Sequence, residues 1–319
     1  MLQLGYALTS ELHSAPEMTR HAAQAEQAGF GFALISDHFH PFFTRHAESP
    51  FVWAVVGAIA QATSNLRLGT GVTCPIVRYH PALVAQAAAT CETLMPGRFF
   101  LGVGTGANLN EHVYGDRWPA PGERVDMLEE AVAVIRLLWR GERCSHHGRY
   151  FTVDRARLFS VPDAPPPLVV AASGMRMARL AARVGDGLVG LAPDKALIDT
   201  YLAAGDTQAR PRYAQMAVCY ARTEAAARHT AREWWPLGLV PGNVIPELPL
   251  PEHYDALTAG VTDEAIGQAV VCGPDPEKHL AGIRRFAAAG FTHVYLHQVG
   301  PDQEGFFEFY RREILPVVA

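Results

Sequence analysis

Cysteines, long apolar segments and export signals are scarce or missing in this sequence. Its five cysteines are scattered along 319 residues, and none forms a CxxC pair. This distribution disfavours a disulfide framework and indicates reduced thiols in the cytoplasm. No run of about twenty apolar residues is present to cross a bilayer, and residues 1–6 lack the basic and apolar regions of a secretory signal. We therefore expect a cytoplasmic protein without a membrane segment.

The sequence also has little excess charge of either sign. Its formal net charge is −5 at pH 7, from 27 Lys and Arg residues and 32 Asp and Glu residues. This balance gives no electrostatic reason to expect nucleic acid or an anionic membrane as a partner. Low-complexity tracts are absent, and hydrophobic residues, 49% of the chain, suffice for a large core. A small molecule is the expected partner.

One stretch, residues 31–42, brings an apolar run to an abrupt polar end. Phenylalanine, alanine, leucine and isoleucine lead into Asp37, His38 and His40. A buried strand delivers polar side chains to one end of a sheet in this way. The stretch therefore predicts a functional site at the end of a strand.

Short apolar runs alternate with longer amphipathic runs along the chain. We expect strands at residues 2–8, 30–39, 66–75, 98–105, 167–172, 187–192, 213–220 and 292–299. Helices are expected at residues 15–28, 50–63, 81–94, 124–139, 176–184, 224–234, 275–289 and 302–315. Eight strands that alternate with helices indicate an α/β fold, the (β/α)8 TIM barrel. We expect one domain over residues 1–319, with a small hairpin at 150–162 and an irregular insertion at 235–261.

In a TIM barrel the functional residues lie where the strands end and lead into the following loops. Here Glu11 follows the first strand, residues 37–40 the second, 71–74 the third and 104–108 the fourth. Residues 172–174 follow the fifth strand, residues 192–194 the sixth, and His297 ends the eighth. The predicted site is therefore rich in glycine and poor in charge.

Several local patterns allow more than one interpretation. His38 and His40 have the spacing of a metal-binding pair, but the third and fifth strands end without a further histidine or aspartate ligand, so we expect no metal. Residues 144–147 contain a cysteine and two histidines without a second ligand pair, and we interpret them as a surface turn. Residues 102–106 resemble a dinucleotide fingerprint but run into a polar loop, so they are a weak signal for a dinucleotide. Their glycines still indicate that a ligand or a neighbouring chain approaches the backbone closely, because glycine has no Cβ atom. Residues 172–174 precede a helix and suit either a phosphate or a plain turn.

Taken together, these strand ends resemble the luciferase-like superfamily of hydride transferases and monooxygenases. Within it they are most similar to the glucose-6-phosphate dehydrogenases that use coenzyme F420, a deazaflavin. The motifs that carry the resemblance lie at residues 4–6, 36–39, 68–72, 78–81, 100–106, 109–111 and 185–187. The resemblance implies F420 as cofactor and a homodimer.

Carried over by position, the resemblance implies roles for individual residues. Asp37 would bind the deazaflavin, and His38 would be the catalytic acid or base, a role that suits histidine near neutral pH. Gly71 and Val72 match a non-proline cis peptide behind the ring system. Contacts to the cofactor ring or its side chain are implied for Cys74, Thr105, Gly106 and Asn110. Contacts to its phosphate-bearing tail are implied for Ser173, Gly174, Arg176 and Met177.

The sequence departs from this branch at its substrate positions. Ala107 stands where the branch has a catalytic glutamate, and Phe42 stands where it has a tryptophan. The residues that align with its basic set for sugar phosphate are Leu191, Asp194 and Gln268. Because an aspartate in place of a lysine repels a phosphate dianion, glucose 6-phosphate is not the expected substrate. Glu11 or His40 could replace the missing acid.

The sequence thus predicts an F420-dependent oxidoreductase that moves a hydride between the cofactor and a neutral or apolar alcohol or carbonyl compound. His38 and Glu11 are its predicted catalytic residues. The alternatives are a monooxygenase that uses FMN and oxygen, a catalytically silent flavin-binding protein and a barrel metallohydrolase. Trp53, Trp234 and Trp235 either lie near the mouth of the site or pack in the core or a dimer interface.

Overall fold

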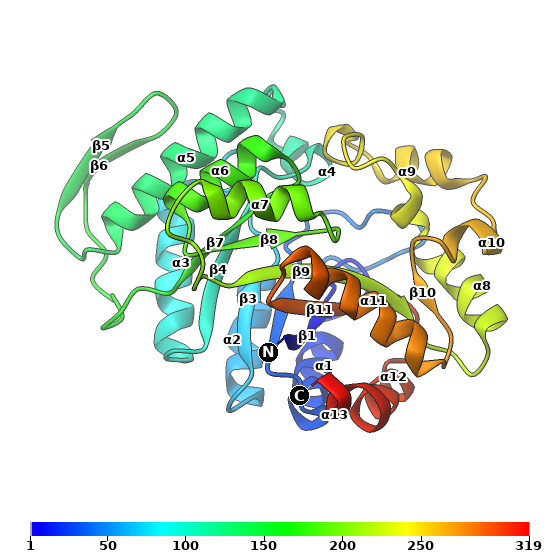
Figure 1. Cartoon of the computed structure of the whole chain (residues 1–319). Coiled ribbons are helices and arrows are strands. Elements are labelled where there is room, and N and C mark those ends of the chain that lie inside the picture. Colours follow the sequence, from blue (N-terminus) through cyan, green and yellow to red (C-terminus); the bar gives the residue numbers. More distant parts are fainter. Residues whose placement is uncertain (1, 319) are drawn as a thin grey trace.

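Eight parallel strands close into a barrel, which confirms the predicted (β/α)8 fold class. The structure is a computed structural model that describes residues 2–318, so the outermost residues of the predicted 1–319 domain lie outside it. Figure 1 shows the strands at the centre and the helices around them. The barrel strands are β1 (Gln3–Leu8), β2 (Phe32–Ile35), β3 (Arg67–Thr70), β4 (Phe99–Val103), β7 (Leu168–Ala171), β8 (Gly187–Gly190), β9 (Arg212–Cys219) and β11 (His293–Gln298).

Aromatic rings fill the interior of the barrel, and they fit there because the residues opposite them are glycines. Pairing of β8 with β9 closes the ring of strands. The register sets Gly5 beside Phe32 and Gly69 beside Phe100. A Cβ atom at either glycine would collide with the neighbouring phenyl ring. Both rings therefore reach the centre of the barrel, where they pack against Tyr213.

Helices surround the barrel and pack their apolar faces against the strands. They are α1 (Ala15–Ala28), α2 (Val52–Ala62), α3 (Pro81–Leu94), α5 (Pro121–Leu138), α6 (Met175–Val184), α7 (Lys195–Ala203), α8 (Glu224–Trp234), α11 (Pro276–Ala289), α12 (Gln303–Phe309) and α13 (Leu315–Val318). A π-helical turn, Tyr310–Ile314, joins the last two. Within residues 2–318, no helix combines the length and the hydropathy that a membrane span requires.

Two segments between the barrel strands differ from the prediction. Helix α7 was not predicted; it starts after Asp194, whose carboxylate accepts a hydrogen bond from the backbone N–H of Leu197 at 3.1 Å. The surface turn predicted at residues 144–147 is wrong, because Cys144–His147 forms strand β5 and pairs with β6 (Thr152–Ala156). This hairpin begins earlier than the predicted one and projects from the barrel beside α5 (Figure 1).

The insertion at residues 235–261 is more regular than predicted. Two 3-10 turns, Pro236–Leu239 and Ile245–Glu247, precede helix α9 (Pro251–Thr258). Helix α10 (Asp263–Ile266) and strand β10 (Val271–Cys272) then return the chain to the barrel, where β10 pairs with β9 outside the ring.

Side chains from the loop after β2 hold the insertion in place. The Thr44 hydroxyl donates to Asp255 at 2.6 Å, and the Arg45 guanidinium lies 3.0 Å from the same carboxylate. These contacts join the loop that carries His38 to helix α9.

Candidate active site

A cavity of about 310 Å³, the inner cavity below, lies at the end of the barrel where the strands lead into their following loops. Strands β2 and β3 end earlier than predicted, so their polar residues lie in these loops. Of the predicted site residues, the cavity is lined by Glu11, Asp37, His38, Phe42, Gly71, Val72, Cys74, Thr105, Gly106, Ala107, Asn110, Ser173, Met177 and Leu191. The lining does not include Gly174, Arg176, Asp194 or Gln268.

Glu11 and His38 form the polar centre of the inner cavity. The Glu11 carboxylate is buried and accepts a hydrogen bond from the Ser36 hydroxyl at 2.5 Å. Burial on its own would raise the pKa of Glu11, but the His38 imidazole and the Ser36 hydrogen bond outweigh it and lower the pKa below its ordinary value. Glu11 is therefore ionised at neutral pH.

The loop around His38 is fixed by Asn110 of helix α4 (Asn108–Glu111). The Asn110 side-chain oxygen accepts from the backbone N–H groups of Phe39 at 2.9 Å and His40 at 3.2 Å. His38 Nδ1 lies 3.2 Å from the His40 carbonyl oxygen, which can only accept. The Asn110 amide nitrogen lies 3.4 Å from the same Nδ1, so the nearer carbonyl oxygen is the contact that favours Nδ1 as donor. In that tautomer Nε2 keeps a free lone pair, as a general base requires. The His38 ring packs against Phe42 at a centroid distance of 4.8 Å.

His40, the second histidine of the loop, is turned away from the inner cavity. Its Nδ1 lies 2.8 Å from the Leu109 carbonyl oxygen, and its ring stacks on His112. His40 is therefore not positioned to replace the acid missing at Ala107.

Behind the cavity wall lies a buried network of charges centred on Arg78. Its guanidinium pairs with Asp37 at 2.8 Å, and Thr73 donates to the same carboxylate at 2.7 Å. The backbone N–H of Arg78 donates to Glu111 at 2.7 Å. Burial raises the pKa of Glu111 to about 7, although Arg78 opposes this shift. Glu111 also lines the inner cavity; it was missed because the resemblance marked residues 109–111 only as a shared motif.

Two glycine-containing segments form a flat part of the cavity wall. The peptide between Gly71 and Val72 is cis, as the resemblance implied. A Cβ atom at Gly104 would lie 2.7 Å from the Val72 side chain, and Gly106 has a φ of 73°, which favours glycine. This wall lets a planar ring approach the backbone closely.

The start of helix α6 offers an anion site at the edge of the cavity. Gly174 is its N-cap residue and provides no side chain to cap the first N–H groups. These free donors, with Ser173 and Met177 on the cavity wall, suit a phosphate group. Arg176 lies outside, where its exposed guanidinium pairs with Asp126 at 2.5 Å.

The part of the lining that was predicted to face the substrate is mostly apolar. Three of the predicted substrate positions line the cavity: Phe42, Ala107 and Leu191. The other two do not, because Asp194 caps α7 and Gln268 is exposed after α10. Residues of the insertion and of two barrel strands, which the sequence did not indicate as site residues, also line the cavity: Trp235, Leu237, Ile245, Gln215 and Tyr295. Gln215 and Tyr295 lie within β9 and β11, whereas the other three come from the segment that follows α8.

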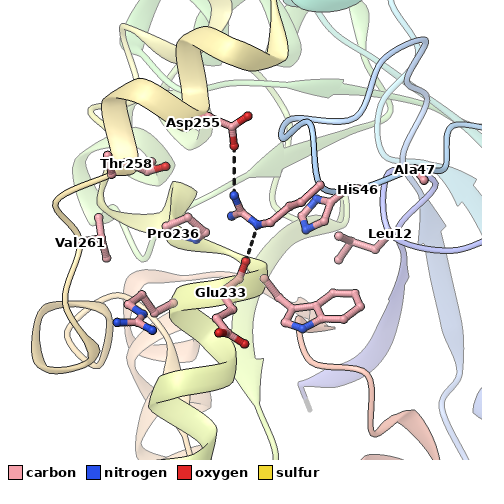
Figure 2. Close-up of a pocket in the computed structure, with 12 residues that line it drawn as sticks. Leu12, His46, Ala47, Glu233, Pro236, Asp255, Thr258 and Val261 are labelled. Atoms are coloured by element: carbon pink, nitrogen blue, oxygen red, sulfur yellow. Dashed lines mark hydrogen bonds and ion pairs between the residues drawn. The ribbon is translucent and has the colours of Figure 1, made fainter.

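The other two predicted tryptophans lie elsewhere. Trp53 packs against Phe99 beneath α2, with ring centroids 6.3 Å apart. Trp234 does not line the inner cavity; it lines a second cavity of about 560 Å³ between the loop after β2, the end of α8 and helix α9 (Figure 2). Within residues 2–318 there is no cluster of three or more histidine, cysteine or carboxylate side chains placed to bind a metal ion.

Comparisons with known proteins agree with this geometry. The sequence profile of the family described as luciferase-like monooxygenase matches residues 3–293. An F420-dependent glucose-6-phosphate dehydrogenase from Beutenbergia cavernae is 36% identical over 99% of this chain and 97% of its own length. An F420-dependent hydroxymycolic acid dehydrogenase from Mycobacterium tuberculosis is 37% identical over 98% of this chain and 87% of its own length.

One solved structure matches the whole chain closely. It is an F420-dependent secondary alcohol dehydrogenase in complex with an F420-acetone adduct. It superposes with a TM-score of 0.93 at 30% sequence identity and covers 100% of this chain and 99% of its own.

Proposed function

Because this chain belongs to the luciferase-like monooxygenase family, as its sequence motifs predicted, we propose that it is an F420-dependent oxidoreductase. It would transfer a hydride between the deazaflavin and a carbon atom of a neutral or apolar alcohol or carbonyl compound. One observation carries the proposal: the inner cavity combines the His38–Glu11 pair with walls that contain no lysine or arginine among the described residues. Such a site can move a proton but has no cation for a sugar phosphate.

The residues around the inner cavity fit a deazaflavin. The flat wall at Gly71, Val72 and Gly104 would support its ring system, and the start of α6 at Ser173 would bind its phosphate. When bound, the deazaflavin supplies a two-electron acceptor or donor of hydride.

The chain's own residues supply orientation and proton transfer. For alcohol oxidation, Nε2 of His38 takes the hydroxyl proton while the hydride leaves the substrate carbon. Ionised Glu11 stabilises the imidazolium that results. Asn110 and the His40 carbonyl oxygen keep the ring in the required orientation and tautomer.

The apolar lining defines the substrate class. Phe42, Trp235 and Ile245 would enclose the groups on either side of the reacting carbon, and Ala107 leaves space where a carboxylate would otherwise stand. Because no arginine or lysine from the described residues lines this cavity, a phosphate dianion on the substrate would find no cation there, and the start of α6 would be taken by the phosphate of the cofactor. We therefore propose secondary alcohols or ketones with apolar substituents as substrates.

Fluorescence quenching of oxidised F420 and, in parallel, of FMN tests the cofactor. We expect tight binding of F420 and weak binding of FMN. Selective binding of FMN would favour the oxygen-dependent monooxygenase, and binding of neither would contradict the proposal.

Reduction of F420 by alcohols tests the substrate class. Propan-2-ol, cyclohexanol and octan-2-ol should support turnover, whereas glucose 6-phosphate should not. Tight F420 binding without turnover on any alcohol or carbonyl compound would identify a catalytically silent binding protein.

A further inference from the structure

Two polar side chains, from Gln215 and Tyr295, lie on the floor of the inner cavity. The register pairs Gln215 of β9 with Tyr295 of β11, so the two side chains leave neighbouring strands side by side. Both residues lie within their strands, whereas Glu11 and His38 come after the ends of theirs. An amide and a phenol therefore lie deeper in the barrel than the catalytic pair.

The rest of this floor is apolar. Ala7, Leu34 and Val189 line the inner cavity and belong to the same buried cluster as Tyr295. Polar groups in such surroundings cost free energy unless they form hydrogen bonds. The hydrogen-bond partners of Gln215 and Tyr295 therefore decide what this floor can hold.

The Gln215 amide is only partly used by the protein. Its nitrogen donates a hydrogen bond to Nδ1 of His297 at 3.0 Å, and no other hydrogen bond joins this amide to residues 2–318. Gln215 is half-buried, and because its side chain points into the barrel, its exposed part faces the inner cavity. One amide N–H and the amide oxygen are therefore free to bind a ligand.

His297 holds this amide in its orientation. Burial lowers the pKa of His297 to about 4, so the ring is neutral at pH 7 and Nδ1 can accept the hydrogen bond. The ring also contacts Trp235 of the insertion edge-on, at a centroid distance of 4.4 Å. Because His297 is fully buried, it positions Gln215 and does not itself reach a ligand.

The Tyr295 hydroxyl is the second free group. Tyr295 is 3% exposed and lines the inner cavity, and its hydroxyl makes no hydrogen bond within the described part of the chain. Unlike the unpartnered hydroxyls of Tyr150 and Tyr201, it is not sealed off by neighbouring atoms. Burial raises the pKa of Tyr295, so the hydroxyl keeps its proton at neutral pH and can both donate and accept.

The two floor residues lie across the barrel from the flat wall. Around the ring the strands follow in the order β9, β11, β1, β2, β3, β4, β7 and β8. Strands four places apart in a ring of eight are opposite, so β9 faces β3 and β11 faces β4. Gly71 and Gly104 follow β3 and β4 and belong to the wall proposed for the deazaflavin ring. Gln215 and Tyr295 are therefore on the side of the cavity that this ring leaves to the substrate.

We propose that Gln215 and Tyr295 form a subsite for a second hydroxyl group of the substrate, so that neutral diols are the preferred substrate class. The inference rests on the proposed function and deepens it. One hydroxyl is oxidised beside His38. The other donates to the Gln215 amide oxygen and accepts from the amide N–H or from the Tyr295 hydroxyl. The groups of the substrate that contact Phe42 and Trp235 stay apolar.

The free groups of the floor match a hydroxyl and not an anion. A hydroxyl donates and accepts hydrogen bonds, as do an amide and a phenol. A carboxylate or phosphate would meet no lysine or arginine among the described residues of the lining, and ionised Glu11 would repel it. A wholly apolar substituent would bury the amide and the phenol without partners, which weakens binding.

Substrate pairs with the same carbon skeleton test the subsite. The quantity compared is kcat/KM for F420 reduction by a mono-alcohol and by the corresponding diols. The pairs are propan-2-ol with propane-1,2-diol, and cyclohexanol with cyclohexane-1,2-, 1,3- and 1,4-diol. At least one diol should exceed its mono-alcohol about tenfold or more, which is beyond the statistical effect of two equivalent hydroxyls.

Variants at the floor residues connect this preference to the subsite. Gln215→Met keeps the length of the side chain without its hydrogen-bonding groups, so the diol preference should fall to about twofold or less. F420 affinity, measured by fluorescence titration, should not change. Tyr295→Phe should lose part of the preference because the amide remains. Gln208→Met changes an exposed glutamine after α7 and should keep the wild-type preference.

The outcomes separate the subsite from the proposed function. Mono-alcohols that turn over as well as every diol would overturn the subsite and leave the proposed function intact. The same preference in Gln215→Met and in the wild type would also overturn it. A clear loss of F420 affinity in Gln215→Met would assign the amide to the cofactor and overturn the substrate subsite. A wild-type protein that reduces F420 with no alcohol would overturn both.

A binding measurement without turnover tests the contact itself. With reduced F420 bound, the protein cannot oxidise an alcohol, so an added diol stays intact. In protein labelled with 15N at the glutamine side-chain amides, the preferred diol should shift the amide signal that Gln215→Met lacks, and cyclohexanol should shift it less. Equal shifts from the diol and cyclohexanol, or no shift with any diol, would overturn the subsite.

Discussion

The inner cavity has one wall built from strand ends and one built from the insertion, and the two differ in chemistry. The strand-end wall carries Glu11, Asp37 and His38, backed by the buried ion pair to Arg78. The insertion wall carries Trp235, Leu237 and Ile245, and none of these can exchange a proton. Proton transfer needs fixed charges on a rigid barrel, whereas substrate choice needs shape. Reaction and selectivity can therefore change separately in this chain.

Among changes in the strand-end wall, replacement of His38 should cause the largest loss of activity. His38→Ala should reduce hydride transfer about 10²–10⁴-fold because the proton acceptor is gone, while F420 affinity changes little. Stopped-flow absorbance of F420 gives the first quantity and fluorescence titration the second.

The matched control for this variant is His40→Ala. The His40 side chain faces Leu109 and His112, so its removal should leave most of the rate. An equal loss in both variants would move the catalytic role away from His38.

Glu11→Gln should reduce turnover about 10–100-fold at neutral pH, because the imidazolium loses its counter-charge. The folded-state pKa of Glu11 is lowered, so the carboxylate is ionised above that pKa and its support is lost as pH falls through it. Turnover of the wild type should therefore decrease with falling pH, at pH values below the ordinary carboxyl pKa range. The variant should not show this decrease. An identical pH profile of turnover in both proteins would show that a group other than Glu11 causes the decrease at low pH.

The insertion wall should affect substrate choice alone. Trp235→Ala should raise KM for cyclohexanol and octan-2-ol about tenfold through lost apolar contact, with F420 affinity unchanged. Leu250→Ala is the control, because this exposed leucine of the insertion lies outside the lining. Equal KM values for bulky and small alcohols in the Trp235 variant and the wild type would show that the insertion does not select the substrate.

The smallest expected effect is on the pH dependence of stability, and it comes from Glu111 at the strand-end wall. Glu111 has a pKa raised to about 7, so between the unfolded pKa and that value the folded chain binds more protons than the unfolded chain. Its contribution to stability therefore falls as pH rises through this range. Glu111→Gln should flatten the pH dependence of the free energy of unfolding, measured by urea denaturation between pH 5 and 8, by about 1 kcal/mol or more. The same slope in both proteins would contradict the raised pKa.

The barrel could be predicted because its signals are local. Apolar and amphipathic runs alternate along the strands and helices of the barrel. Each run shows its own hydrophobic period, so its strand or helix can be predicted without knowledge of distant residues. Helix α7 was missed because it has only nine residues and follows a short loop of Leu191, Ala192 and Pro193, which extends the apolar run of β8. The hairpin was misplaced because Cys144–His147 has little β propensity and is held by pairing and by contact of His146 with Glu130 at 3.1 Å.

The site could be predicted only where one strand end carries the signal. Asp37 and His38 follow directly from the run before them, and the glycines of two strand ends follow from the barrel rule. Trp235 and Ile245 could not be found this way, because their position depends on how the insertion folds back over the barrel. Asp194 and Gln268 were assigned to the substrate by alignment alone, and the structure leaves them outside the lining. The homodimer and the cytoplasmic location stay predictions.

The phenyl rings inside the barrel limit how this sequence can change. Phe32 occupies the space that a Cβ atom of Gly5 would need, and Phe100 does the same for Gly69. A larger residue at either glycine therefore fits only after its partner ring has become smaller. We expect these two pairs to covary among relatives, and a designer who removes one ring must fill the opposing glycine in the same step.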